Sequence, residues 1–227
     1  MSGGTLAILA IAVVIIIAIA VMASAAERQR AEALESWARE RGWNYDRERP
    51  ELVDRFSGTP FRSGRSNAKA RHVLTADHRG QRVLAFEYSY TTTSHNGQNT
   101  TTTTHCFTVV TVSTPATPVL EVRLEHLGHA LLGLVGVHDL QVGERVFDQA
   151  FRITAQEDAF ALAVLEPVVR AWLLEDPEGR VPFRFSGDHL LGWSSGRIDP
   201  DTVVAGADTL IDLVERVPAQ VWEGTRG

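Results

Sequence analysis

The sequence predicts an α+β protein: an N-terminal transmembrane helix followed by one domain in which an antiparallel sheet packs against two to three helices. Three patterns lead to this expectation. The chain begins with a long uncharged apolar segment, its middle alternates in strand-like runs between turn residues, and its end has an amphipathic helical pattern. We expect an anchor with an Arg-rich helical extension over residues 1–41, the α+β domain over 42–221 and a short tail over 222–227.

The first element is the apolar segment from Leu6 to Ala26, which contains no charged residue. As a helix it spans about 31 Å, which matches the hydrocarbon core of a bilayer, so the lipid bilayer is the first predicted partner. The alternative is a signal peptide cleaved near Ala25, because Ala23-Ser24-Ala25 resembles a cleavage site. No Lys or Arg precedes the segment and it is longer than the apolar part of most signal peptides, so we favour a retained anchor.

Charged residues around this segment predict its orientation. Arg28, Arg30, Arg39 and Arg41 follow the span and none precedes it, which places the domain in the cytoplasm by the positive-inside rule. The single cysteine, Cys106, agrees with a reducing compartment. The formal charge of −6, with no basic cluster, argues against a nucleic-acid partner.

The helix is expected to continue beyond the span to Arg41, where Gly42 can cap it. Ala31, Leu34 and Ala38 form one apolar stripe on this extension. One or two heptads are too few to indicate a coiled coil, so we expect the stripe to dock on the chain's own domain.

The sheet is predicted from runs that alternate with period two from Lys69 onward. One strand ends before a turn at His78-Arg79-Gly80 and the next begins at Arg82; HCFTVVTV and PVLEVRLEH are two more, with Pro115 and Pro118 in the loop between them. The irregular segment Arg47 to Asn67 is expected to cover a sheet edge.

The second half mixes strands and helices. Phe147 to Ile153 alternates like a strand, and Thr154 to Glu157 resembles a capping box that opens a helix, which Pro167 must kink or restart. A hairpin is expected to turn at Ser186-Gly187-Asp188. Asp199 and Pro200 are expected to cap and begin a final amphipathic helix that Pro218 ends.

The stretch YSYTTTSHNGQNTTTTTHC, Tyr88 to Cys106, looks most like a chemical site. A type I′ turn centred on Asn96-Gly97 would make Thr93 face Thr100 and Phe86 face Phe107, on the core side of a long hairpin. His105 and Cys106 then point to opposite faces, and His95 lies about 23 Å from His105, so one ion cannot bind all three. We therefore expect Thr92 to Thr101 to be a projecting hairpin that contacts a protein partner.

Two further motifs suggest catalysis. Gly192 to Gly196 is a literal G-x-S-x-G with Ser194 as the candidate nucleophile, but no histidine follows His189 in the chain and no helix follows at once. His126, His129 and His138 could form a zinc-like site, although the segment between them is apolar and interrupted by glycines. We expect a strand end and structural histidines, with no catalytic residue, metal or cofactor.

The order of the parts resembles a family of uncharacterised bacterial single-pass membrane proteins with a domain of unknown function. The resemblance rests on the anchor, an Arg-rich helix ending in Gly42-Trp43, the strand VLAFEYSY, the runs FDQAFRI and LLGW, and a final helix begun by Asp-Pro. The resemblance implies an α+β domain on a membrane anchor, and it assigns no functional residue. The expected function is protein or ligand binding at the cytoplasmic membrane without catalysis; the alternative is a membrane-tethered hydrolase or metal-dependent enzyme.

Overall fold

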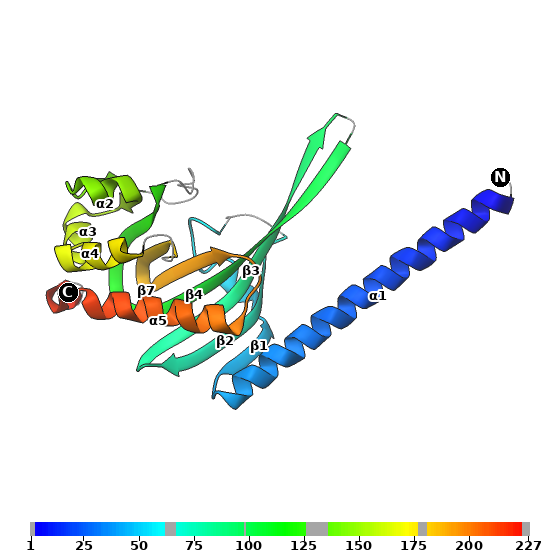
Figure 1. The fold of residues 1–227 in the computed structure, drawn as a ribbon, viewed down its shortest axis with the longest axis horizontal. Coiled ribbons are helices and arrows are strands. Elements are labelled where there is room, and N and C mark those ends of the chain that lie inside the picture. Colours follow the sequence, from blue (N-terminus) through cyan, green and yellow to red (C-terminus); the bar gives the residue numbers. More distant parts are fainter. Residues whose placement is uncertain (1–2, 62–66, 98, 126–135, 177–180, 224–227) are drawn as a thin grey trace.

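A computed structural model describes residues 3–61, 67–97, 99–125, 136–176 and 181–223. The chain forms a long N-terminal helix and one seven-stranded antiparallel sheet with helices against one face, so the predicted α+β class is confirmed (Figure 1). The strands are β1 Asn44–Glu48, β2 Lys69–His78, β3 Gln81–Asn96, β4 Asn99–Leu124, β5 His138–Leu140, β6 Phe151–Ala155 and β7 Phe183–Ser195. The helices are α1 Gly3–Glu40, α2 Arg145–Ala150, α3 Asp158–Val164, α4 Pro167–Glu175, α5 Pro200–Arg216 and α6 Ala219–Glu223, with a 3-10 turn at Pro50–Leu52.

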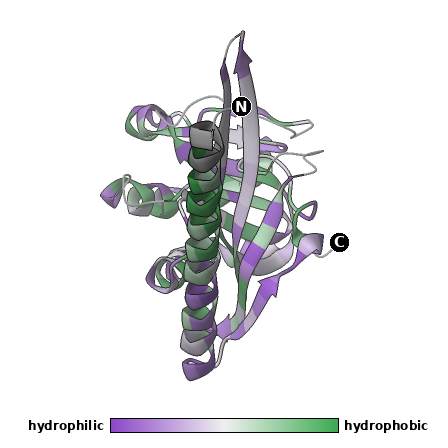
Figure 2. Cartoon of the chain, turned by 90° about the vertical axis from the view of Figure 1, so that its right-hand side faces the viewer, coloured by the Kyte–Doolittle hydropathy of each residue, from purple (hydrophilic) through white to green (hydrophobic). Residues whose placement is uncertain are grey.

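Helix α1 has an apolar outer part and a docked inner part. Its apolar stretch from Ala10 onward is long and apolar enough to cross a membrane and is not buried against the domain; an N-terminal signal sequence can meet the same criterion (Figure 2). Ala31, Leu34 and Ala38 are buried on the domain, which confirms the predicted docking. The helix ends in a Schellman motif, because Gly42 has φ +72° and Trp43 N donates to Ala38 O at 2.8 Å.

Strand β4 is the strand on which the sheet is built. It pairs with β3 over residues 99–112, with β7 over 107–122 and with β6 over 120–124. The prediction of two strands separated by a loop is wrong, because Pro115 and Pro118 lie within the strand. The register of β4 against β7 shifts between Ser113 and Leu120, and such bulges tolerate residues that cannot donate to the ladder. Likewise, β7 continues through Gly187, with φ +58°, and does not form the predicted hairpin.

The sheet has a core on each face. On the helix face, α5 lies along β4 and β7, and α3 and α4 complete the cover (Figure 1). On the other face, Leu52 and Phe61 pack on Phe86 and Tyr88. The segment predicted to cover an edge therefore covers a face, while the edge strand is β1, which pairs with β2.

Helix boundaries in the second half differ from the predicted ones. The segment predicted as a strand contains most of helix α2, which includes Phe147, and strand β6 begins only at Phe151. Both phenylalanines are buried and their ring centroids lie 4.8 Å apart, which fits residues four positions apart on a helix. The expected capping box fails because Thr154 lies in β6, and α3 begins at Asp158. The restart at Pro167 is confirmed.

Helix α5, which was predicted as the last helix, begins and ends as predicted, although the short helix α6 follows it. Asp199 Oδ1 accepts from the backbone N–H groups of Asp201 and Thr202 at 3.0 and 3.2 Å. The helix ends at Arg216, just before Pro218.

The long hairpin exists, but its predicted register is wrong by two residues. Thr93 faces Thr102 and Asn96 faces Asn99, so the turn follows Asn96 instead of being centred on Asn96-Gly97. A shift of two keeps every side chain on the same face, since side chains alternate along a strand. Phe86 and Val109 are accordingly buried on the predicted core side.

A buried arginine fastens the segment after β1 to the sheet. Arg184 is fully buried and its Nε donates to Glu121 Oε2 at 2.9 Å, while its remaining N–H groups donate to the carbonyl oxygens of Ser57 and Thr59. Its guanidinium also lies over the ring of Trp193. A Cβ on Gly58 would come within 2.9 Å of that guanidinium, so this position requires glycine.

We predict that Arg184→Met lowers the free energy of unfolding by about 3–5 kcal/mol, because Glu121 is left as a buried charge without its partner. Urea denaturation of the full chain in detergent measures this change. The double variant Arg184→Met/Glu121→Leu should regain part of the loss, since the buried carboxylate is removed, while the buried Arg123, whose Nε lies 3.8 Å from Glu121 Oε1, loses its partner. Equal stability of the single variant and the unchanged chain would contradict the assignment.

Candidate functional site

The functional candidate is the junction between α1 and the sheet, together with the hairpin that projects beside it. At the junction, Arg30 Nη2 donates to Glu87 Oε2 at 2.7 Å and to Ile198 O at 2.9 Å. Ile198 N donates to the same Glu87 oxygen at 3.1 Å. One buried carboxylate therefore ties α1 to β3 and to the turn before α5.

A second contact lies one helical turn closer to the apolar stretch. His72 sits at a bulge in β2, with φ +49°, and is almost completely buried. Its Nε2 lies 2.9 Å from Glu27 Oε1 and its Nδ1 lies 2.8 Å from the Tyr45 hydroxyl. Glu27 and Arg30 thus fix both the rotation and the height of α1 on the sheet, immediately after the apolar segment ends.

The Thr-rich arm, residues 91–96 and 99–104, leaves the domain on the same side as the apolar part of α1 (Figures 1 and 2). Asn96 lies nine residues beyond Glu87, or roughly 30 Å along a strand. Leu6 lies 24 residues before Arg30, or roughly 36 Å along a helix. Because Arg30 contacts Glu87, both distances start at the same point, and the arm and the apolar helix extend over comparable distances from it.

The arm is uncharged and its side chains pair with one another. No Asp, Glu, Lys or Arg occurs between Tyr88 and Leu120. Thr92 Oγ1 lies 3.0 Å from His105 Nε2, and His95 Nδ1 lies 2.8 Å from Thr100 Oγ1. The arm therefore satisfies many of its own polar side chains without any ionic group.

The backbone edges of the arm are open. Strand β2 stops pairing with β3 at Ser89, and β7 stops pairing with β4 at Phe107. Beyond these residues, no further strand borders the arm within the described part of the chain. Open edges can add a strand from another protein, but they are too costly to place in bare hydrocarbon.

Of the residues predicted as alternative catalytic or metal sites, the structure describes Ser194 and His138. Ser194 lies inside β7 opposite Thr108, not at an elbow between a strand and a helix. His126 and His129 lie outside the described residues. His138 Nε2 is 2.6 Å from Asp158 Oδ1, and the described residues contain no cluster of three metal-ligating side chains.

The surroundings of Cys106 determine how reactive its thiol is. Cys106 lies on the sheet face of Glu87, opposite to His105, as predicted from strand alternation. Burial, together with the nearby Glu87 carboxylate, raises the pKa of the Cys106 thiol to about 11. At neutral pH the thiol is protonated and a poor nucleophile.

Arg30 and Glu87 were not recognised from the sequence. The available signal was Glu87 itself, an acidic residue within the apolar run VLAFEYSY, because a charge on a buried strand requires a partner. Nothing in the sequence indicates that the partner is Arg30, which is 57 residues away.

We predict slow alkylation of Cys106. With its pKa about two units above that of an ordinary thiol, the thiolate fraction at pH 8 falls about 100-fold, and the rate of iodoacetamide labelling should fall with it. Labelling of the folded chain, followed by mass spectrometry, measures the rate against the urea-unfolded chain as control. Glu87→Gln should accelerate the reaction; an unchanged rate would show that Glu87 does not act on the thiol.

Comparison with known proteins gives a structural relative. No protein-family model and no curated protein sequence matches the chain. The crystal structure of the mycobacterial trehalose monomycolate transport factor A, TtfA, is similar with a TM-score of 0.60 and 16% sequence identity. The similarity covers 83% of this chain and 96% of the TtfA chain, and at this identity it shows that the two share a fold.

Proposed function

We propose that this protein is a membrane-anchored, non-catalytic accessory factor in the transport of an envelope glycolipid, and that its Thr-rich arm contacts a membrane-embedded protein partner. The observation that carries the proposal is the rigid junction at Arg30 and Glu87, which directs the arm along the apolar part of α1. The fold shared with a trehalose monomycolate transport factor supports the transport role.

The physical properties of the arm favour a protein partner over bare lipid. Its lack of charge removes the largest cost of entering the membrane region. Its two open edges make contact with hydrocarbon alone unfavourable. Each backbone N–H or C=O group left without a hydrogen bond in hydrocarbon typically costs several kcal/mol of free energy. A membrane protein that offers a polar groove or a strand edge satisfies both conditions.

We further propose that the domain lies on the cytoplasmic side. The arginines after the apolar segment support this orientation, as does the presence of a single cysteine.

A reporter fused after Gly227 tests the orientation. We predict that a reporter active in the cytoplasm gives signal and one active outside the cytoplasm is silent, because the cluster Arg28, Arg30, Arg39 and Arg41 resists translocation. Activity measured in intact cells decides between the two, and fusion of both reporters to a protein of known orientation is the control. The reverse pattern would place the domain on the other side, and release of the reporter into the soluble fraction would indicate cleavage near Ala25.

Shortening the arm tests the transport role. Joining Thr92 to Thr103 through Asn-Gly, in place of residues 93–102, keeps a cross-strand pair at the new turn and removes no residue of either core. We predict unchanged folding and membrane location, measured by circular dichroism and fractionation. Export of the cell's envelope glycolipid should fall at least several-fold in cells whose own copy has been replaced.

The matched control replaces Thr93 and Thr102 by serine, which preserves the length, edges and polarity of the arm, and should support normal export. Normal export by a stably folded shortened variant would contradict the role of the arm. A shortened variant that fails to fold would show that the arm belongs to the core structure and would also contradict the proposal.

A further inference from the structure

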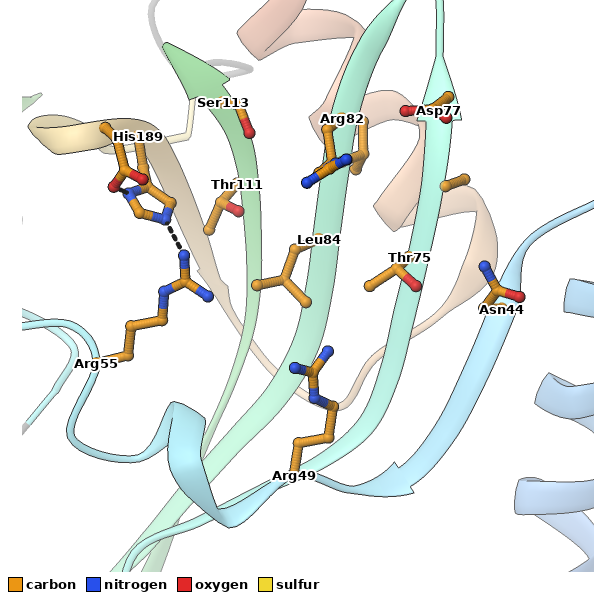
Figure 3. A pocket seen from close by; sticks show the side chains of 13 residues that line it. Asn44, Arg49, Arg55, Thr75, Asp77, Arg82, Leu84, Thr111, Ser113 and His189 are labelled. Carbon is orange, nitrogen blue, oxygen red and sulfur yellow. Dashed lines mark hydrogen bonds and ion pairs between the residues drawn. The ribbon is translucent and has the colours of Figure 1, made fainter. Parts of the chain in front are cut away.

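A concave site, separate from the α1 junction and the arm, lies on the sheet face opposite the helices. It is a groove of about 490 Å³, within the range of small-molecule sites. Its floor contains Leu84 and the buried Thr111, and its walls come from β2, β3, β7 and the segment after β1 (Figure 3). None of the motifs noted in the sequence draws attention to it, because its residues come from five separate stretches of the chain.

Three arginines border this groove. Figure 3 shows the side chains of Arg49, Arg55 and Arg82 around Leu84; Arg49 and Arg55 come from the segment after β1, and Arg82 comes from β3. Two carboxylates, Asp77 and Asp188, also line the groove. Arg82 has no ion-pair partner among the described residues, although Asp77 is its cross-strand neighbour.

Arg55 is held in position by a histidine. Its Nη2 lies 2.7 Å from His189 Nε2, and His189 Nδ1 pairs with Asp188 (Figure 3). Burial lowers the pKa of His189; the Asp188 carboxylate opposes this shift and Arg55 adds to it. A neutral imidazole can donate from Nδ1 to Asp188 and accept from Arg55 at Nε2, so Asp188 is already occupied and an exposed guanidinium is fixed at the mouth of the groove.

The other groups in the groove suit a hydroxylated ligand. Thr75, Thr111 and Ser113 offer hydroxyl groups and Asn44 offers an amide. Arginines bind phosphate oxygens with paired N–H groups, and hydroxyls and amides bind sugar hydroxyls. A ligand with one phosphate on a sugar-sized polar body matches this combination.

The position of the groove favours a soluble ligand. Along β3, Arg82 lies five residues before Glu87, roughly 17 Å from the α1 junction and on the side away from the arm. A lipid headgroup that remains in the bilayer cannot reach it when α1 spans the membrane. The ligand would come from the aqueous phase beneath the domain.

We propose that this groove binds a soluble phosphorylated sugar or polyol, with Arg55 and Arg82 contacting the phosphate. The site is separate from the arm and independent of the transport role. Binding there would let the protein respond to a metabolite while the arm remains on its partner.

Isothermal titration of the full chain tests the proposal. The chain should be kept in a polyoxyethylene detergent, because sugar-headed detergents would compete. Glucose 6-phosphate is expected to bind saturably with one site per chain and more tightly than inorganic phosphate, and glucose should show no measurable binding. Arg82→Gln should weaken the binding of glucose 6-phosphate about 10-fold or more, as expected for lost hydrogen bonds to a charged group.

Two further variants make the result decisive. Arg145→Gln removes an exposed arginine on α2 and should leave binding unchanged. Ser113→Asp adds a negative charge to an exposed position in the groove and should abolish binding without affecting the core. Thermal denaturation confirms that each variant folds.

Several outcomes would overturn the proposal. These are no saturable binding of either phosphate probe, or binding that Arg82→Gln and Ser113→Asp leave intact. Tighter, Arg82-dependent binding of dioctanoyl phosphatidic acid than of glucose 6-phosphate would assign the groove to a lipid headgroup and refute a soluble ligand.

Discussion

The contact between Arg30 and Glu87 determines how the whole domain is placed. Glu87 is buried on β3, where an uncompensated carboxylate is costly, so the sheet requires a cation at one point on its face. Helix α1 supplies it one turn after the apolar segment, and the backbone of Ile198 accepts from Arg30 Nη2 and donates to Glu87 Oε2. Helix α1, the sheet and the start of α5 are therefore joined at one point, which gives the domain a defined orientation relative to α1.

That orientation separates two surfaces along a single strand. Strand β3 begins beside the arginine-bordered groove at Arg82, passes the α1 junction at Glu87 and ends in the arm at Asn96. The arm lies on the side of the apolar part of α1, and the groove lies on the side away from the arm. The layout thus resembles an adaptor, with the uncharged arm that we propose contacts a protein at one end and the charged groove that we propose binds a small molecule at the other.

Sequence patterns were sufficient where local chemistry determines structure. The Gly42 cap, the Asp199 cap and the alternation of Phe86 and Tyr88 each depend on a few neighbouring residues. Predictions from sequence patterns were wrong where pairing between distant segments overrides local signals. The prolines in β4 predicted a loop, because the sequence does not indicate the bulges of β4 against β7. The groove and the Arg30–Glu87 pair could not be predicted, since both join segments that only the topology brings together.

Strand β4 has a mechanical consequence. Its 26 residues run without interruption from the tip of the arm into the centre of the domain. Ladder hydrogen bonds lie across the strand direction, so a pull on the arm along its axis loads in shear the bonds of β4 to β7 and of β3 to β2, many at once. A force applied at the tip of the arm is therefore carried into the whole sheet and does not peel one strand from its neighbour at a time.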